Sequence, residues 1–277
     1  MKQTFSFIAL ILLSTLIYAQ PTIEVFLNSK PYPSKGPTIE SIEENLELLI
    51  KDISPQPIKI VSKFNKNGFI VNETKYGKGG GKVSESFWEY NQENKLAKKT
   101  HKYFVNLSGW KVEETKLTYN DTTGFLSYIK VSKNDVQQTM SKVFCDSIGQ
   151  PIDIRVLDGN GVYVSNEKII YSSAINLIRV MVFKSSNQFS GSYTYPIDPS
   201  KPIRNNQIEK QYYPNGELML DSLDSNSKTN QGYYYEYSYD NYGNWIEKDT
   251  YQVSLGKNNK IKDKKLEHRI KRIIKYY

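Results

Sequence analysis

The sequence contains one cysteine and two histidines in 277 residues. A lone thiol, Cys145, cannot form an internal disulfide. Neither His101 nor His268 has a second His or Cys at ligand spacing, which argues against a zinc site. Catalysis by a nucleophile, a histidine and an acid needs a histidine positioned by the fold, and both of these lie among charged residues. The sequence therefore predicts no metal, no cofactor and no catalytic residue, and favours a protein without enzymatic activity.

Long apolar runs are also scarce, and the one that exists is at the start of the chain. Lys2 precedes the run Phe7 to Leu13, and Ile17-Tyr-Ala19 follows it. This pattern is typical of a signal peptide, residues 1–19, cleaved after Ala19. An uncleaved membrane anchor is the alternative, but it needs about 20 apolar residues, and Ser14 and Thr15 interrupt this run.

With no second apolar stretch of that length, the mature protein is expected to have no transmembrane segment and to be soluble outside the cytoplasm. It is expected to be periplasmic, outer-membrane-associated or secreted. Hydrophobic residues make up 38% of the chain and charged residues 24%, with 22 tyrosines. This composition supports a packed core and excludes disordered and collagen-like classes.

Residues 20–57 are predicted to form an N-terminal segment with an amphipathic helix at about 38–53. Apolar residues recur there at helical spacing, Thr38 can cap the helix, and glutamates favour its first turns. Pro55 and Pro57 then end it. The apolar positions are Ile39, Ile42, Leu46, Leu49, Ile50 and Ile53.

From residue 58 onward a turn motif recurs: an aromatic residue, then Asp or Asn, then Gly or Asn, and two residues later a large apolar side chain. Tyr239 to Trp245 is the clearest copy, and Cys145 takes the aromatic position in another, so we interpret Cys145 as a small buried hydrophobe. Four of the six intervals between copies are 26 or 27 residues. The copies begin at residues 64, 90, 119, 145, 171, 212 and 239.

Such an internal repeat has a physical explanation, because Asp or Asn initiates a turn and Gly or Asn adopts the left-handed conformation that tight hairpins need. Two strands per repeat predict about fourteen strands. The predicted fold over residues 58–277 is all-β, an antiparallel meander of repeated hairpins forming a curved, β-solenoid-like sheet or half-barrel. The longer interval contains residues 184–206, whose composition predicts a loop.

The motif Tyr-Asp-x-x-Gly-Asn-Trp at 239–245, followed by Arg272 to Tyr277, resembles YD-repeat (RHS-like) proteins, particularly short exported ones of Bacteroidetes. Tyr212 to Leu218 is similar to MORN-like β-repeat proteins. This resemblance covers about residues 58–277, and the other repeats are degenerate. It implies an antiparallel β architecture whose repeats carry no catalytic residues.

Two features predict a binding surface. Alternate tyrosines from Tyr233 face one side of a strand, and the segment Lys257 to Lys275 carries nine Lys and Arg. Sheet packing and a solubilising basic edge strand are the alternative interpretations. The candidate binding residues are Tyr233, Tyr235, Tyr237, Trp245, Lys264, Lys265, Arg269 and Arg272.

Together these observations predict an exported envelope protein that acts as a non-enzymatic binding or interaction module. Its partner would be an envelope macromolecule, whether a protein, a polysaccharide or an anionic lipid surface, and not a nucleic acid. Two alternatives stay open. One is a periplasmic carrier that holds a lipid or apolar ligand in a half-barrel. The other is a carbohydrate-active hydrolase with unrecognised carboxylates.

Overall fold

The computed structural model describes residues 21–49, 57–199, 201–203, 210–223, 231–256 and 260–277. Within them the chain forms one sheet of seventeen strands, one short α-helix and one 3-10 turn. The predicted signal peptide lies outside these residues. The elements are α1 (Glu24–Leu27), β1 (Ile39–Leu48), β2 (Lys59–Phe64), β3 (Ile70–Tyr76), β4 (Lys82–Tyr90), β5 (Leu96–Val105), β6 (Gly109–Tyr119), β7 (Leu126–Lys133), β8 (Val136–Cys145), β9 (Pro151–Asp158), β10 (Tyr163–Ser172), η1 (Ser173–Ile175), β11 (Leu177–Lys184), β12 (Phe189–Pro196), β13 (Lys210–Tyr212), β14 (Leu218–Leu223), β15 (Gln231–Tyr239), β16 (Trp245–Leu255) and β17 (Ile261–Tyr276).

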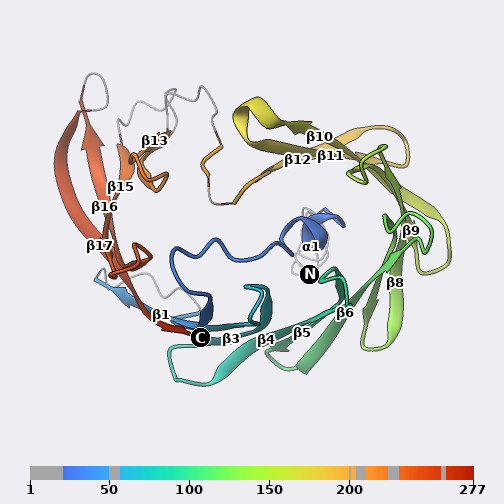
Figure 1. The fold of residues 1–277 in the computed structure, drawn as a ribbon, viewed down its shortest axis with the longest axis horizontal. Coiled ribbons are helices and arrows are strands. Elements are labelled where there is room, and N and C mark those ends of the chain that lie inside the picture. Colours follow the sequence, from blue (N-terminus) through green and yellow to red (C-terminus); the bar gives the residue numbers. More distant parts are fainter. Residues whose placement is uncertain (1–20, 50–56, 200, 204–209, 224–230, 257–259) are drawn as a thin grey trace, which may run out of the picture.

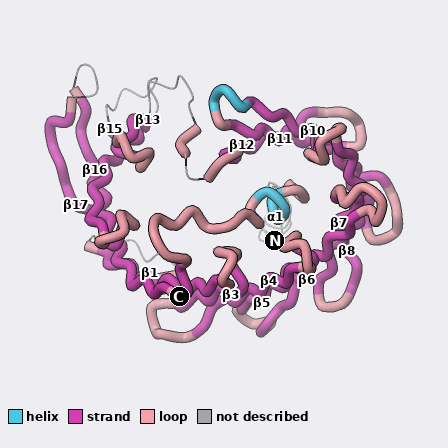
Figure 2. The backbone as a smooth tube through the Cα atoms, viewed as in Figure 1, coloured by secondary structure: helices cyan, strands magenta, loops and turns pink. Residues whose placement is uncertain are grey.

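The described strands are paired in an antiparallel meander. Each strand from β1 to β11 pairs with the next one, and so does each from β13 to β16. β17 also pairs with β1, Glu44 opposite Arg272, so the series of paired strands runs from β12 through β1 to β13. This open sheet confirms the predicted all-β class, and Figure 2 shows strands forming nearly all of its wall.

The sheet curves around residues 21–36, which lie on its concave face (Figure 1). The backbone N–H groups of Thr22 and Ile23 donate to the carboxylate of Glu167 in β10, at 2.6 and 3.2 Å. Further along, the N–H of Lys35 donates to Asn244, between β15 and β16. The N-terminal segment therefore links distant parts of the sheet.

An apolar core fills the concave face of β4 to β12. Ile23 and Leu27 of the α1 region are buried against it. A helix of four residues has no stability of its own, so α1 is held by this packing, where burying one isoleucine side chain contributes about 2 kcal/mol. The sheet residues of this core are Leu96, Leu117, Leu126, Ile129, Val143, Ile154, Val156, Ile169, Ile178 and Val180.

All seven predicted repeat turns are hairpin or strand-to-strand turns in the structure. A side-chain oxygen of Asp240 accepts hydrogen bonds from the N–H groups of Tyr242 and Asn244. Asp146 likewise accepts them from the N–H groups of Ile148 and Gln150. Gly149 and Gly243 both have φ of +86°. Because successive turns of a meander alternate between its two edges, all seven lie at one edge, here named the repeat edge.

The aromatic position of the repeat also has a contact that recurs. The hydroxyl of Tyr90 donates to the carbonyl of Ile70, and that of Tyr171 to the carbonyl of Pro151. Cys145 occupies the same position, with its Sγ 3.4 Å from the carbonyl oxygen of Leu126. Burial raises the pKa of this thiol.

The predicted helix at 38–53 is wrong for its described part, because residues 39–48 form β1. The strands on both sides of β1 stabilise its extended conformation, and its own sequence does not predict these partners. Glu43 pairs with Lys59 of β2, and Glu44 and Glu47 pair with Arg272 and Lys271 of β17. Two ladders of interstrand hydrogen bonds thus override the helical spacing. Residues 50–53 lie outside the described part of the chain.

The predicted loop at 184–206 is also wrong in part, because residues 189–196 form β12 and pair with β11. Its alternating tyrosines, Tyr193 and Tyr195, pack against the apolar core. The loop was predicted from the serine, glycine and proline content of this segment, and that composition does not show the alternation. The last three residues of the predicted loop are not described.

In the ranges given above, no helix is both long and apolar enough to cross a membrane.

Candidate functional site

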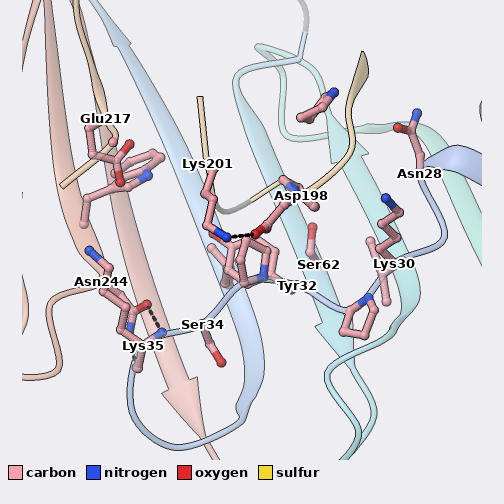
Figure 3. Close-up of a pocket in the computed structure, with 18 of the residues that line it drawn as sticks. Asn28, Lys30, Tyr32, Ser34, Lys35, Ser62, Asp198, Lys201, Glu217 and Asn244 are labelled. Atoms are coloured by element: carbon pink, nitrogen blue, oxygen red, sulfur yellow. Dashed lines mark hydrogen bonds and ion pairs between the residues drawn. The ribbon is translucent and has the colours of Figure 1, made fainter. Parts of the chain in front are cut away.

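A pocket of about 1240 Å3 lies on the concave face, bordered by residues 27–35. This stretch, named here the strap, crosses the pocket together with the chain that follows β12 (Figure 3). The remaining walls come from β1, β2 and β3, from the turn between β13 and β14, from the start of β16, and from Arg272 of β17. The pocket therefore gathers segments from both ends and the middle of the sequence.

Arg272 is the most constrained charged group of the pocket. Its guanidinium donates to the Glu44 carboxylate from Nε at 2.7 Å, and its Nη1 donates to the Tyr32 hydroxyl at 3.0 Å. The guanidinium carbon also lies 3.2 Å from the ring centroid of Trp245. A carboxylate, a hydroxyl and an aromatic face thus fix the guanidinium before any ligand arrives.

The strap is anchored at both of its sides. The N–H of Tyr32 donates to the carbonyl of Gly68 in the first repeat turn. Asn244, in the clearest repeat motif, accepts the N–H of Lys35 and donates to its carbonyl, at 2.8 and 2.7 Å. Next to it, Gly36 has φ of +79° and lies against the ring of Tyr242. Two repeat turns therefore hold the strap across the pocket.

Charged groups of both signs line the pocket near the end of β12. The Lys201 ammonium lies 2.8 Å from the Asp198 carboxylate, and Figure 3 shows this pair reaching toward Tyr32. The Lys30 ammonium donates to the carbonyl of Ile197. Burial lowers the pKa of Lys30 and raises the pKa of the Tyr32 hydroxyl.

The predicted binding residues separate into two clusters. Trp245 and Arg272 line the pocket, and Tyr237 contacts the Trp245 ring edge-on, with centroids 6.1 Å apart. Lys248, whose pKa burial lowers, lies over the rings of both Tyr235 and Trp245. Tyr235, Tyr237, Trp245 and Arg272 therefore belong to the cluster that borders the pocket.

Lys264 and Arg269 belong to the other cluster, on the opposite face of these strands. The Lys264 ammonium lies 2.6 Å from Glu236 and over the ring of Tyr251. Arg269 makes a two-armed ion pair with Asp249, at 2.5 and 2.7 Å.

The interstrand register places the two remaining predicted residues in one row. Tyr233 lies opposite Gln252, and Gln252 lies opposite Lys265. This row is close to the edge of the sheet opposite the repeat turns, whereas the pocket lies near the repeat edge. The eight predicted residues thus do not form one site.

Sequence reasoning missed most of the pocket. Glu44 was assigned to a helix, and its pairing with Arg272 spans 228 residues. Tyr32 and Lys30 lie in a proline-rich stretch. Prolines predict an extended chain, but they do not predict that this chain crosses a pocket. Asn244 was visible as the residue after the glycine of the clearest repeat. Its position in the motif is the one sequence feature that could have identified Asn244 as a candidate site residue.

In the residues that the structure describes, no group of three or more His, Cys, Asp and Glu side chains is placed to hold a metal ion.

Neither the protein-family models nor the curated proteins include a match to this chain, so no family confirms the YD-repeat resemblance. Among solved structures, a porin-like protein from Bacteroides uniformis aligns over 87% of this chain and 100% of its own, with 15% identity and a TM-score of 0.41. The structure of TcdB2-TccC3-TEV aligns over 72% of this chain and 14% of its own, with 14% identity and a TM-score of 0.27. The Tc holotoxin pore of Photorhabdus luminescens aligns over 71% of this chain and 14% of its own, with 13% identity and a TM-score of 0.27.

Proposed function

We propose that this chain is an exported, non-enzymatic binding module of the cell envelope, and that the pocket beneath the strap holds an oligosaccharide. The observation that carries the proposal is the fixed guanidinium of Arg272, held at the pocket wall by Glu44, Tyr32 and Trp245. A polar group whose position is set in advance loses little freedom when a ligand binds.

The mixture of charges in the pocket favours a ligand rich in hydroxyl groups. Arg272 lies beside Glu44, and Lys201 lies beside Asp198. A ligand carrying one sign of charge would meet like charges in each pair. A hydroxyl both donates and accepts hydrogen bonds, so it satisfies carboxylates and cations alike. Aromatic rings, here Tyr195 and Tyr212 among the lining residues, pack against the apolar faces of sugar rings.

An apolar ligand fits this pocket less well. The apolar core of β4 to β12 is already covered by Ile23 and Leu27 around α1. The pocket is lined by apolar side chains such as Phe64 and Ile70, but also by Lys30, Asp198 and Arg272, and covering these charged groups with a lipid would be costly. The geometry therefore supports a polar ligand better than the carrier alternative.

Hydrolysis of a glycoside also fits less well than binding. It needs one protonated carboxyl group as the general acid. Three of the four carboxylates that line the pocket are paired with cations, Glu44 with Arg272, Glu73 with Lys75 and Asp198 with Lys201, and the fourth is Glu217. This arrangement supports polar contacts rather than proton transfer.

The test is a calorimetric titration of the purified protein with oligosaccharides released from envelope polysaccharide. Arg272→Lys keeps the charge but loses the forked contact to Glu44, and we expect it to weaken binding about tenfold. Trp110→Phe, at an exposed position outside the pocket, is the matched control and should bind like the unmodified protein. Thermal midpoints check that all three are folded.

Saturable binding that Arg272→Lys weakens supports the proposal. It is overturned if no oligosaccharide binds, or if Trp110→Phe weakens binding as much as Arg272→Lys. New reducing ends released during the titration would instead establish the hydrolase alternative. Export is tested separately by the intact mass of the protein recovered outside the cytoplasm, which should begin at Gln20.

A further inference from the structure

The edge of the sheet opposite the repeat edge exposes large apolar side chains at four successive hairpin tips. These are the turns between β5 and β6, β7 and β8, β9 and β10, and β11 and β12. Leu107 is fully exposed, and Val136, Val162 and Phe189 are 63%, 60% and 56% exposed. We name these four residues the apolar rim. At the repeat edge, by comparison, the exposed large apolar side chains in or next to the described turns are Ile148, Ile152, Tyr239 and Tyr242.

Aromatic residues extend the rim at its first tip. Phe104 and Trp110 face each other across the β5–β6 hairpin, with ring centroids 5.8 Å apart. Both are about half exposed, at 50% and 47%. Indole rings in such positions favour the boundary between water and lipid, because they combine an apolar body with a polar N–H group.

Exposed lysines lie at the same edge. Lys133 precedes the β7–β8 turn, and Lys184 precedes the β11–β12 turn. Lys78 is in the β3–β4 turn, and Lys260 and Lys262 flank the start of β17. Two acids, Asp135 and Asp158, also lie at the tips, and the carboxylate of Asp158 already accepts the N–H groups of Asn160 and Val162. Lys133 and Lys184 thus balance the two acids at the four tips, and the excess of cations at this edge comes from Lys78, Lys260 and Lys262, with one exposed acid, Asp263, beside Lys262.

We propose that the apolar rim docks this protein on the surface of an anionic lipid bilayer, with the tips inserted among the headgroups and the lysines against lipid phosphates. Four separate tips on a curved sheet fit a broad, deformable surface, whereas a groove would fit a peptide. The excess of cations along this edge is complementary to anionic headgroups. This docking is independent of the pocket, which lies near the repeat edge.

The test is flotation with vesicles of phosphatidylethanolamine and phosphatidylglycerol, and with vesicles of phosphatidylcholine alone. A tip variant combines Leu107→Asn, Val136→Ser, Val162→Ser and Phe189→Ser. Asparagine suits position 107 because that residue has φ of +70°. Ile148→Ser, an equally exposed aliphatic residue at the repeat edge, is the matched control. All proteins must share one N-terminus by intact mass, so that the apolar run at residues 7–13 contributes equally.

We expect the unmodified protein and Ile148→Ser to float with anionic vesicles, and the tip variant to bind about tenfold less. Trp110 emission should shift to the blue on binding, a change that Trp110→Phe removes. The proposal is overturned if the unmodified protein does not float, if the tip variant floats equally, or if neutral vesicles capture the protein as well as anionic ones. Should the combined variant not fold, Leu107→Asn and Phe189→Ser are measured singly against the same outcomes.

Discussion

The hydroxyl of Tyr119 donates a 2.9 Å hydrogen bond to the carbonyl oxygen of Leu96. Tyr119 begins one repeat turn, and Leu96 is the large apolar residue that follows the preceding turn. Each such bond therefore joins two consecutive repeats. Burial raises the pKa of this hydroxyl to about 12, so it stays a donor at neutral pH. The same bond recurs at Tyr90 and Tyr171, and it gives a reason for tyrosine at the aromatic position of these repeats.

We expect Tyr119→Phe to lower the free energy of unfolding by about 1 kcal/mol, because the Leu96 carbonyl loses its side-chain donor while the ring stays packed. Urea denaturation measures this change. Tyr128→Phe, at a position 40% exposed, is the control and should be nearly neutral. Equal effects of the two substitutions would show that the bond between repeats adds no stability.

Gly149→Ala should be strongly destabilising. Its backbone has φ of +86°, and an added Cβ would lie 2.7 Å from Cδ1 of Phe125. Gly80→Ala is the matched control, because Gly80 has φ of +75° but no heavy atom within 4 Å of that Cβ position. We expect a loss of about 1 kcal/mol at Gly80 from backbone strain alone, and about 1–3 kcal/mol more at Gly149 from steric crowding. Thermal midpoints that fall equally would contradict the packing of Phe125 on this turn.

The ion pair between Asp249 and Arg269 predicts a pH dependence. Hydrogen bonds from the Arg269 guanidinium hold the pKa of Asp249 below its ordinary value of 3.8. A lowered pKa stabilises the fold above the unfolded value, and that stabilisation is lost as the pH falls through the folded pKa. Asp249→Asn should therefore cost about 2 kcal/mol at neutral pH, and the cost should shrink below about pH 4.

Denaturation curves between about pH 2 and pH 7 measure this difference. Arg269→Gln removes the guanidinium and keeps the carboxylate, so it should also lose the pH-dependent stabilisation. If the unmodified protein and Asp249→Asn differ by a constant amount over the whole range, the carboxylate does not gain stability from this pair.

Ser141→Ala should stabilise the protein. The Ser141 side chain is 0% exposed, and its Oγ has no hydrogen-bond partner among the described residues. Removing a buried hydroxyl that makes no hydrogen bond is expected to add about 1 kcal/mol. Ser127→Ala provides the contrast, because the Ser127 hydroxyl donates to the Thr118 carbonyl at 2.9 Å. A thermal midpoint that falls for Ser141→Ala would reveal a partner for this hydroxyl.

The repeat turns were predictable because each depends on residues that are close in the sequence. Asp240 and Gly243 define a turn through local hydrogen bonds and one left-handed conformation. β1 was not predictable in the same way. In the structure β1 pairs with β2 on one side and with β17 on the other. From the sequence alone, however, the spacing of Ile39, Ile42 and Leu46 fits a helix as well as a strand. Only partners far along the chain decide between the two.

The pocket was predictable only at Trp245 and Arg272. These two residues stood out by type, in a repeat motif and in a basic segment. The contacts that give them a role come from Tyr32 and Glu44, in segments where the sequence signals no chemistry. Conversely, Lys264 and Arg269 stood out equally, but their charges are engaged by Glu236 and Asp249 on the other face of the sheet.

The position of β1 between β2 and β17 has a consequence for how the chain folds. β2 is synthesised soon after β1, but β17 begins more than 200 residues later. A chain that emerges from its N-terminus first must therefore keep one side of β1 unpaired until β17 arrives. An unpaired strand side is a template for pairing with another molecule, and contacts so distant in sequence form slowly. We expect this interval to be when the protein is most vulnerable to aggregation and most dependent on chaperones.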